Sequence, residues 1–293
     1  MKTLAAILAL SSLALHAQGD FEIPGAAPLE DDIPDSLMNR WIPTFIVSAG
    51  ASQIAFSDWI KGGENSITWT TALDLGAGYK TKSFRTNHRL KASYGQTKIG
   101  SDDFQTNDNE LYIESIYSPR TGMFVEPYAS ANLRTQITDG YKYTEDSKER
   151  IASFFDPGYL MQSAGFIYEK LPHVTTRVGF AAQEIFTNRF RQYSDDPETP
   201  DETEAFRFDT GLESVTEVEI EFMENMIYKK KLSLFTRFES LDIWDVRWDN
   251  TVNMKVNDYF NAQFTYLLVY RHEEIQKPQI KQTLQLGVSI SIL

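Results

Sequence analysis

Apolar and polar residues alternate with a period of two along most of the chain after residue 40, and this alternation constrains the fold more than any other feature. Residues 217–222 read EVEIEF, and residues 282–293 read QTLQLGVSISIL. Successive side chains of a β-strand point to opposite faces, so each such segment predicts a strand with one apolar and one polar face. The chain is therefore expected to be all-β.

The alternating segments predict twelve strands joined as an antiparallel, up-and-down meander. Counted from the first strand, the odd-numbered connections are generally long, and the even-numbered ones, such as TKSF and PRTG, are mostly short. Bacterial transmembrane barrels have an even number of strands, long extracellular loops and short periplasmic turns. The pattern therefore predicts a transmembrane β-barrel with both ends on the periplasmic side. The predicted strands are residues 41–56, 66–80, 85–97, 109–118, 123–136, 159–170, 174–187, 207–222, 231–240, 247–256, 259–271 and 281–292.

Two connections stand out by their length. Residues 137–158 form a long predicted extracellular loop. Residues 223–231, MENMIYKKK, would lie on the periplasmic side, where turns are usually short. They are either a longer periplasmic connection or a continuation of both flanking strands past the membrane.

The first residues predict export from the cytoplasm. Lys2, the apolar residues 4–15 and the small residue Ala17 form the pattern of a secretory signal peptide over residues 1–17. This apolar run is too short to span a bilayer as a helix, which takes about 20 residues. Residues 18–40 are rich in Pro, Gly and acidic residues and predict a periplasmic tether. Residues 41–293 would then form the barrel, in the outer membrane of a Gram-negative bacterium.

The chain is acidic, with 28 Lys and Arg against 41 Asp and Glu in 293 residues and a formal net charge of −13. A nucleic-acid-binding protein needs a basic surface that displaces counterions from phosphates, so we expect no nucleic-acid partner. The chain has no cysteine, which excludes disulfides, thiolate catalysis and cysteine-ligated metal sites. Membrane lipid is the expected partner, and the acidic segment 194–204 could take up divalent cations that bridge lipopolysaccharide.

The polar faces of the predicted strands carry charged residues of both signs, among them Glu110 and Glu114. In a transmembrane barrel these faces line the lumen. In a soluble sandwich or lipocalin-like barrel the apolar faces point inward instead, and the pattern alone does not decide between them. A charged lumen could pass or bind a polar solute, or salt bridges could fill and stiffen it. The lumen candidates are the carboxylate ladder Glu217, Glu219 and Glu221, with Arg237, Arg247 and Lys255 as cross-strand partners.

The segment FSDWIKGGEN near the first predicted hairpin combines a lysine with two glycines, as phosphate-binding loops do. It lacks the Gly-x-x-x-x-Gly-Lys-Ser/Thr spacing of such a loop, and no helix is predicted after it. We therefore interpret it as the first extracellular turn. Gly62 and Gly63 would supply the reversal, Glu64 and Asn65 would start the next strand, and Trp59 would lie at the membrane rim or under the loop.

This segment also resembles a Trp-x-x-Gly-Gly-Glu-Asn signature of an uncharacterised family, a domain of unknown function of Gram-negative envelopes. DPGYL at 156–160 is similar to the entry of that family's middle strand, and residues 232–270 are similar to its Leu-x-Leu-Phe, Asp-Val-x-Trp-x-Asn and Met-Lys-Val-Asn pattern. The resemblance covers nearly the whole mature chain. It implies a β-barrel of the outer-membrane type and brings no established activity.

The histidines form no convincing catalytic or metal-binding constellation. The chain has no His-Glu-x-x-His spacing and no Gly-x-Ser-x-Gly elbow. His88 with Ser93, or His272 with Ser289, could be assembled into a lipase-like set only by assumption, and His173 is expected in a turn. We therefore predict no catalytic residue, no metal ligand and no cofactor.

The function that these features favour is passive passage or binding of a small polar solute through a charged lumen. The competing hypothesis is a structural or partner-binding barrel whose interior is plugged by side chains. An outer-membrane hydrolase is the third hypothesis.

Overall fold

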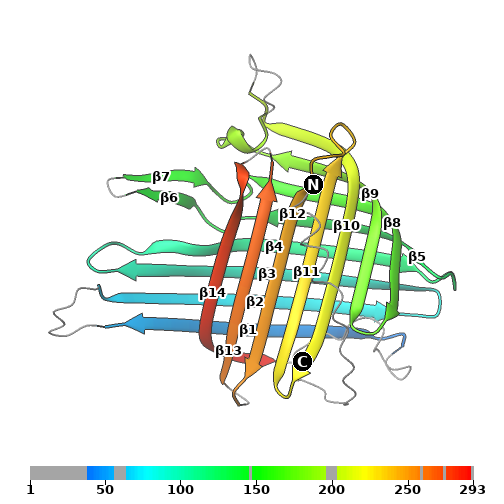
Figure 1. Cartoon of the computed structure of the whole chain (residues 1–293), viewed down its shortest axis with the longest axis horizontal. Helices are drawn as coiled ribbons and strands as arrows, with labels where there is room; N and C mark the ends of the chain where they lie inside the picture. Colours follow the sequence, from blue (N-terminus) through cyan, green and yellow to red (C-terminus); the bar gives the residue numbers. More distant parts are fainter. Residues whose placement is uncertain are drawn as a thin grey trace.

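Twelve strands pair in sequence order and close into one antiparallel barrel, in which β1 (Trp41–Ile54) pairs with β14 (Ile275–Ser291) (Figure 1). The computed structural model describes residues 38–55, 64–144, 147–195, 203–257, 260–272 and 275–291. The predicted twelve-stranded meander is confirmed. The other strands of the barrel are β2 (Ser66–Lys80), β3 (Phe84–Ile99), β4 (Gln105–Pro119), β5 (Glu126–Thr135), β8 (Gly158–Leu171), β9 (Val174–Phe186), β10 (Phe206–Met223), β11 (Met226–Arg237), β12 (Asp245–Lys255) and β13 (Phe260–Arg271).

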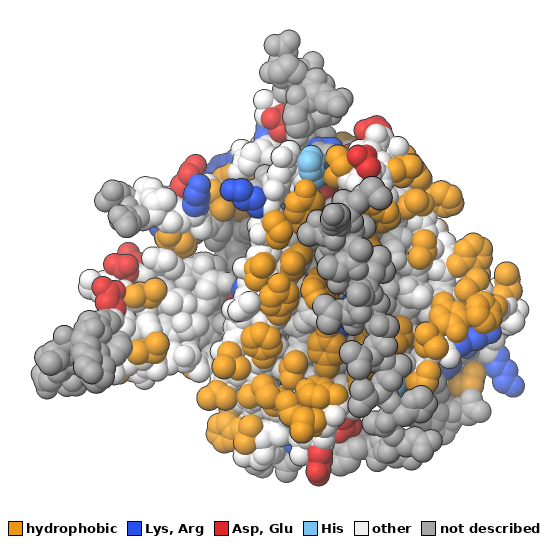
Figure 2. All heavy atoms as spheres, in the orientation of Figure 1, with side chains coloured by type: hydrophobic (Ala, Val, Ile, Leu, Met, Phe, Trp, Pro, Cys, Tyr) orange, Lys and Arg blue, Asp and Glu red, His pale blue; other side chains and the backbone are white. Residues whose placement is uncertain are grey.

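The apolar face of the sheet points outward. Phe180 on β9 is 69% exposed and Leu284 on β14 is 68% exposed. Figure 2 shows hydrophobic side chains gathered over the outer face formed by the last strands of the barrel. A soluble barrel would bury this face in its core, whereas membrane hydrocarbon solvates it. The soluble alternative is therefore wrong, and the chain has the architecture of an outer-membrane β-barrel.

The long connection at 137–158 contains a hairpin that the sequence analysis did not predict. β6 (Gly140–Thr144) and β7 (Ser147–Ala152) form a separate two-stranded sheet, which projects beside the extracellular connections (Figure 1). The Lys148 ammonium lies 4.1 Å from the centre of the Tyr141 ring. The hairpin was missed because β7, SKERIA, is a run of charged residues without apolar–polar alternation.

Residues 223–231 continue the two flanking strands. β10 ends at Met223 and β11 begins at Met226, so the connection consists of Glu224 and Asn225. Asn225 has a φ of 65°, the left-handed conformation that tight hairpin turns require, and His173 in the β8–β9 turn has a φ of 64°. Of the two alternatives for this segment, the longer periplasmic connection is therefore wrong.

Some of the predicted organisation lies outside the described residues. This applies to the signal peptide predicted over 1–17 and to most of the tether predicted over 18–40. The barrel wall begins at Trp41, the first residue predicted for it. Among the residues that the structure describes, no helix is long and apolar enough to cross a membrane.

Within the described residues, the seam between the first and last strands is shorter than the neighbouring ladders. Residues 46–51 of β1 pair with residues 286–291 of β14, whereas β1 pairs with β2 from Trp41 to Ile54. Toward the extracellular end, residues 279–285 of β14 pair with β13, and the described residues of β1 beyond Ala51 do not pair with them. Figure 1 shows the two strands diverging there.

Candidate functional site in the lumen

β4 carries the acidic residues around which the lumen is organised. Asp108, Glu110 and Glu114 lie on the same face of β4, at successive heights along the barrel. Their cationic partners include residues of β9, β11, β12 and β14, and none of these strands is a neighbour of β4 in the barrel. These ion pairs therefore cross the lumen.

Glu114 anchors the most buried of these crossings. Its carboxylate accepts hydrogen bonds from Arg177 of β9 at 2.8 Å and from Lys231 of β11 at 2.8 Å. Glu114 is 6% exposed and Arg177 is 3% exposed. Lys231 also donates to the Tyr112 hydroxyl at 3.1 Å and pairs with Glu217 of β10 at 2.7 Å. Two carboxylates and two cations thus form one network across the middle of the lumen.

Glu110 forms the next crossing toward the extracellular end. Arg134 of the neighbouring strand β5 donates to its carboxylate at 2.5 Å, and Arg247 of β12 lies 3.2 Å from it. Arg247 also donates to Asp249 on its own strand at 2.9 Å. One carboxylate on β4 therefore holds two guanidinium groups that come from different walls.

Ion pairs also cross the two ends of the lumen. Toward the extracellular end, Lys281 of β14 donates to Asp108 at 3.0 Å. Toward the periplasmic end, Arg85 of β3 pairs with Glu169 of β8, and both side chains are almost fully buried. Within the described residues, the lumen is thus crossed at four heights.

A cavity of about 90 Å³ lies beside the Glu110 and Glu114 crossings. The guanidinium of Arg271 lies over the ring of Tyr159, at 4.1 Å from its centre. This volume has room for several waters or one small polar group. The lining includes five cationic side chains and two carboxylates: Arg134, Arg177, Lys231, Arg247 and Arg271, with Glu213 and Asp245.

The wall formed by β1, β2, β13 and β14 is built from smaller residues. A Cβ added at Gly78 of β2 would meet nothing within 4 Å, whereas one added at Gly179 of β9 would overlap the carbonyl oxygen of Ala164. Because its side chains are smaller, we take this wall as the less filled side of the lumen, although a Cβ added at Gly50, Gly76 or Gly287 would meet a neighbouring atom within 3.3 Å. Its inward positions are mostly uncharged and include Ser48, Gly50, Thr70, Ala72, Gly76, Gly78, Gln263, Thr265, Thr283, Gln285 and Gly287.

The structure places the predicted carboxylate ladder on the inner face of β10. Glu217 pairs with Lys231 of β11 at 2.7 Å, and Glu219 pairs with Lys229 at 2.9 Å. Glu221 lies one step further toward the periplasmic turn and is half-buried. The register between β10 and β11 places the two glutamates directly opposite the two lysines.

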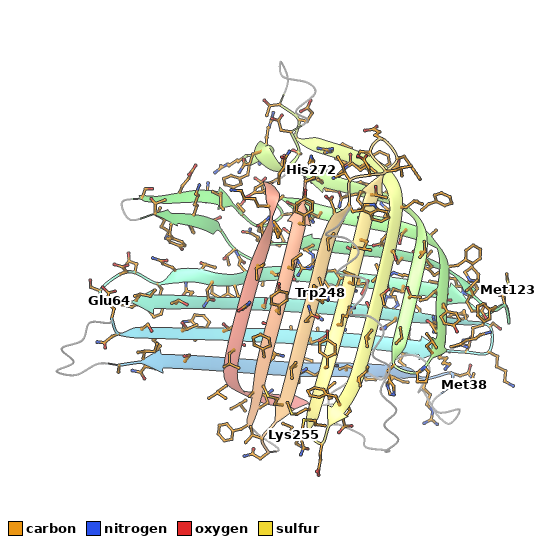
Figure 3. All side chains as sticks on the ribbon, viewed as in Figure 1. Met38, Glu64, Met123, Trp248, Lys255 and His272 are labelled. Atoms are coloured by element: carbon orange, nitrogen blue, oxygen red, sulfur yellow. The ribbon has the colours of Figure 1, made fainter. Side chains whose placement is uncertain are left out.

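The predicted pairing of this ladder with Arg237 and Arg247 is wrong. The tight β10–β11 turn sets a register in which the ladder faces residues 227–231, and Arg237 lies about 20 Å further along β11. Arg237 pairs with Asp209 at 3.1 Å, and Arg247 pairs across the lumen with β4. Lys255 lies at the periplasmic end of β12 (Figure 3).

The predicted first extracellular turn, whose sequence resembles the Trp-x-x-Gly-Gly-Glu-Asn signature, is described only in part. Asn65 accepts a hydrogen bond from the Gly100 N–H at 2.7 Å, which joins the first extracellular connection to the second. Figure 3 shows Glu64 at the end of the barrel that carries these connections. Three residues of the turn lie outside the described residues: Trp59, Gly62 and Gly63.

The histidines are separated by the strand arrangement. The Nδ1 of His88 lies 2.9 Å from the hydroxyl of Ser115 on β4, and this pair is on the lipid-facing side of the wall. Ser93 faces the lumen instead, so the assumed pair with His88 is wrong. His272 lies at the extracellular end (Figure 3), whereas Ser289 pairs with β1 near the periplasmic end.

Sequence reasoning missed the central role of β4. Glu110 and Glu114 could be placed on a polar face, but their partners Arg247 and Lys231 follow them by 137 and 117 residues. Periodicity shows which way a side chain points and not which wall lies opposite. The available signal was three carboxylates on one strand face, at Asp108, Glu110 and Glu114.

A family model gives a sequence match for part of the chain. Residues 51–141 match a family described as "Protein of unknown function (DUF3078)". The predicted resemblance to a domain of unknown function is confirmed over these residues. They run from β1 into β6 and include the whole of β4. No curated protein matches the chain in sequence.

Solved structures of outer-membrane proteins show a distant similarity. The COG4313 outer membrane channel from Pseudomonas putida F1 matches with a TM-score of 0.41 and 10% identity, over 94% of this chain and 100% of that chain. The translocator domain of the autotransporter NalP from Neisseria meningitidis gives 0.36 and 8%, over 85% and 87%. The outer membrane channel DcaP of Acinetobacter baumannii gives 0.33 and 7%, over 86% and 97%. The fold assignment itself comes from the strand pairing and the outward apolar face.

Proposed function

We propose that this barrel binds a small polar solute with a negative charge in its lumen and lets it pass along the less filled wall. The observation that carries the proposal is the lining of the cavity, where the N–H groups of five cationic side chains meet two carboxylates. Four of these cations also pair with Glu110, Glu114, Glu217 or Asp249, so an anion would share their N–H groups with these carboxylates and would be bound by charge-assisted hydrogen bonds, not by an excess of positive charge. A small carboxylate or phosphate group would fit both the charge and the size of the cavity.

The route follows from the difference between the two walls. Ion pairs from β4 cross the lumen at three heights, and Arg85 of β3 pairs with Glu169 of β8 at a fourth. On the other side, the inward positions of β1, β2, β13 and β14 are mostly small or uncharged. A solute would therefore move beside Gly76 and Gly78 and meet the cationic cluster from the side.

A structural or partner-binding barrel is the alternative, and the same ion pairs favour it. A network such as Glu114, Arg177 and Lys231 holds opposite walls together and takes up space in the lumen. If such networks close the bore completely, the protein would act through its loops or its periplasmic tether.

Ion conductance of the purified protein in planar bilayers tests the proposal. The expected result is a small, steady current with a reversal potential that shows preference for anions. Ala72→Trp adds bulk to the inner surface of β2 and should reduce the current, whereas Leu73→Trp adds the same side chain to the lipid-facing surface and should leave it unchanged. Absence of current would reject passage, and a preference for cations would reject the choice of solute.

A catalytic role would need the Ser115–His88 pair on the outer wall to react with membrane lipid. Its hydroxyl and imidazole are within hydrogen-bond distance at 2.9 Å, as a nucleophile and its base must be. We infer no catalysis from this pair alone. Hydrolysis of phospholipid by the purified protein, lost in Ser115→Ala, would replace the proposed passage with an enzymatic function.

A further inference from the structure

One lysine inside the barrel, Lys91 of β3, stands apart from the ion-pair networks. It is the register partner of Asp74 on β2 and of Tyr112 on β4, and the Tyr112 hydroxyl accepts a hydrogen bond from Lys231 inside the lumen. Register partners lie on the same face of a sheet, so the Lys91 side chain points into the lumen. Within the part of the chain that the structure describes, its ammonium makes neither a hydrogen bond nor an ion pair.

The carboxylates nearest to Lys91 are bonded to other cations. Asp74 accepts hydrogen bonds from the Nε of Arg89 at 3.0 Å and from its Nη2 at 2.6 Å. Asp249 pairs with a guanidinium of its own strand at 2.9 Å. The electrostatic neighbours of Lys91 are these two carboxylates and the cations Arg89 and Lys231. The charge of Lys91 therefore has no bonded counterion, in contrast to the cations of the cavity.

The lumen is accessible on the side where Lys91 lies. The Lys91 side chain is exposed although it points inward, and the side chains of Arg89 and Asp249 are 34% and 37% exposed. Arg177 and Glu114, by contrast, are almost fully buried. The strands that carry Lys91 and its neighbours, β2, β3, β4, β11 and β12, are described along their whole length. Water and small solutes can therefore reach the Lys91 ammonium within the barrel.

Lys91 also lies beside the route proposed for the solute. Gly76 of β2 is the register partner of Arg89, and Lys91 lies two residues further toward the extracellular end on the same face of β3. A solute that enters from outside and moves toward Gly76 and Gly78 therefore meets Lys91 first. An ammonium offers three N–H donors, and here they are not shared with a carboxylate of the wall.

We propose that Lys91 selects the passing solute for negative charge by donating its ammonium N–H groups to a carboxylate or phosphate group in transit. This inference rests on the proposed passage and assigns its specificity to one side chain. Fixed charge inside a pore sets which ions pass. The cations of the cavity hold an anion only in competition with their carboxylates, whereas Lys91 has no such competitor among the described residues.

Reversal potentials of the full-length protein in planar bilayers test this assignment, with gradients of potassium acetate and of potassium phosphate measured separately. Lys91→Gln should lower the permeability ratio of anion to cation about fivefold, which is the effect of one unit charge on a monovalent ion ~4 Å away in water. Lys91→Arg keeps the charge and should keep the ratio. The salt with the larger drop identifies the group that Lys91 prefers, and an unchanged ratio in both salts would overturn the proposal.

A matched control removes a lumen lysine without changing the net charge. Lys229 pairs with Glu219 at 2.9 Å, so Lys229→Gln combined with Glu219→Gln deletes both members of one ion pair. The permeability ratio of this double variant should equal that of the wild type. A drop as large as that of Lys91→Gln would show that the preference depends on polar contacts in general, and it would overturn the role of Lys91.

A cysteine at the same position separates charge from size. The chain has no cysteine, so Lys91→Cys carries a single reactive thiol. A methanethiosulfonate reagent with a trimethylammonium group should restore the anion preference, and one of similar size with a sulfonate group should reverse it. Ala92→Cys, on the lipid-facing side of β3, should respond to neither reagent. A thiol at position 91 that does not react, or that reacts without changing the ratio, would overturn the proposal.

The same recordings separate this inference from the proposed function. Wild-type current with an anion preference that Lys91→Gln leaves unchanged overturns the role of Lys91 and leaves the proposed passage standing. Absence of current in the wild type, or a preference for cations, rejects the proposed passage of an anion and this inference with it.

Discussion

The two walls of the lumen are built on different principles. The wall centred on β4 is held to the opposite side by ion pairs, such as Glu114 with Arg177 and Lys231. The wall of β1 and β2 is lined mostly by small or uncharged residues, and its Asp74 pairs with Arg89 of the neighbouring strand β3 and not across the lumen. The first gives the barrel a fixed interior, and the second leaves free volume. A narrow barrel can therefore combine a rigid cross-section with a path for a solute.

A change at the centre of the ion-paired wall gives the strongest test of this difference between the walls. Glu114→Ala removes the carboxylate that Arg177 and Lys231 share and leaves buried charge without its partner. Losing one member of a buried pair costs about 3–5 kcal/mol. We expect this loss in the free energy of unfolding, measured by urea titration in detergent. Thr44→Ala, a buried polar position on β1, should cost far less, and equal losses would show that the two walls do not differ.

Glycine positions test the difference in packing. Gly179→Ala places a methyl group against the backbone of Ala164 and the hydroxyl of Tyr128, and overpacking of this kind costs about 1–3 kcal/mol. Gly78→Ala places the same group in open space. The melting temperature should fall for the first variant and stay the same or rise for the second. A lower melting temperature for Gly78→Ala would mean that the free volume beside β2 is needed for the fold.

The crossing at the extracellular end should matter less than the one at the centre. The side chains of Lys281 and Asp108 are 45% and 26% exposed, and exposed ion pairs contribute about 0–1 kcal/mol. Lys281→Ala should therefore leave the unfolding free energy nearly unchanged. A destabilisation as large as that of Glu114→Ala would contradict the graded importance of the crossings.

Glu126 is a carboxylate that does not take part in the ion pairs across the lumen, and it serves as a reference for the effect of pH on stability. As the first residue of β5, at the periplasmic end of the strand, it accepts hydrogen bonds from the Thr121 hydroxyl at 2.6 Å and from the Thr121 and Gly122 N–H groups of the preceding turn. The Thr121 hydroxyl, followed by these N–H groups, lowers the pKa of Glu126 below its ordinary value. The resulting stability is present above the unfolded pKa of about 4.3 and is lost as pH falls through the lower folded pKa.

We therefore expect Glu126→Gln to lower the unfolding midpoint slightly at neutral pH and to have no effect in acid, below both pKa values. Unfolding midpoints of wild type and variant, measured across this range, provide the check. A difference between the two proteins that is the same at every pH would show that the carboxylate charge is not involved. This is the smallest effect that we predict.

The sequence predicted the wall of this barrel better than its interior. Alternation places Glu217 and Glu219 on the lumen face because a strand has only two faces. It does not give the partners, because Lys229 and Lys231 were assigned to a turn or to a strand end, where the alternation is interrupted by three adjacent lysines. The hairpin β6–β7 was missed for a similar reason, since β6 is only five residues long and β7 carries three charged residues without apolar–polar alternation.

The point at which the β1–β14 ladder ends could not be predicted from the sequence either. Residues 275–279 of β14 include a proline and three charged or amide residues and were assigned to the last loop. Whether β14 and β1 separate there depends on the register of closure, which is a property of the whole barrel. Strand count and loop length contain no information about it.

The acidic face of β4 also has a consequence for the order of assembly. Asp108, Glu110 and Glu114 are synthesised and exported more than 100 residues ahead of Lys281, Arg247 and Lys231. Contacts between residues so far apart in sequence form late, because a long loop must close first. Arg134 and Arg177 reach Glu110 and Glu114 earlier, 24 and 63 residues downstream, so the acidic face of β4 is neutralised in stages. Only the C-terminal strands complete the network, which therefore forms in full when the last strands have joined the barrel.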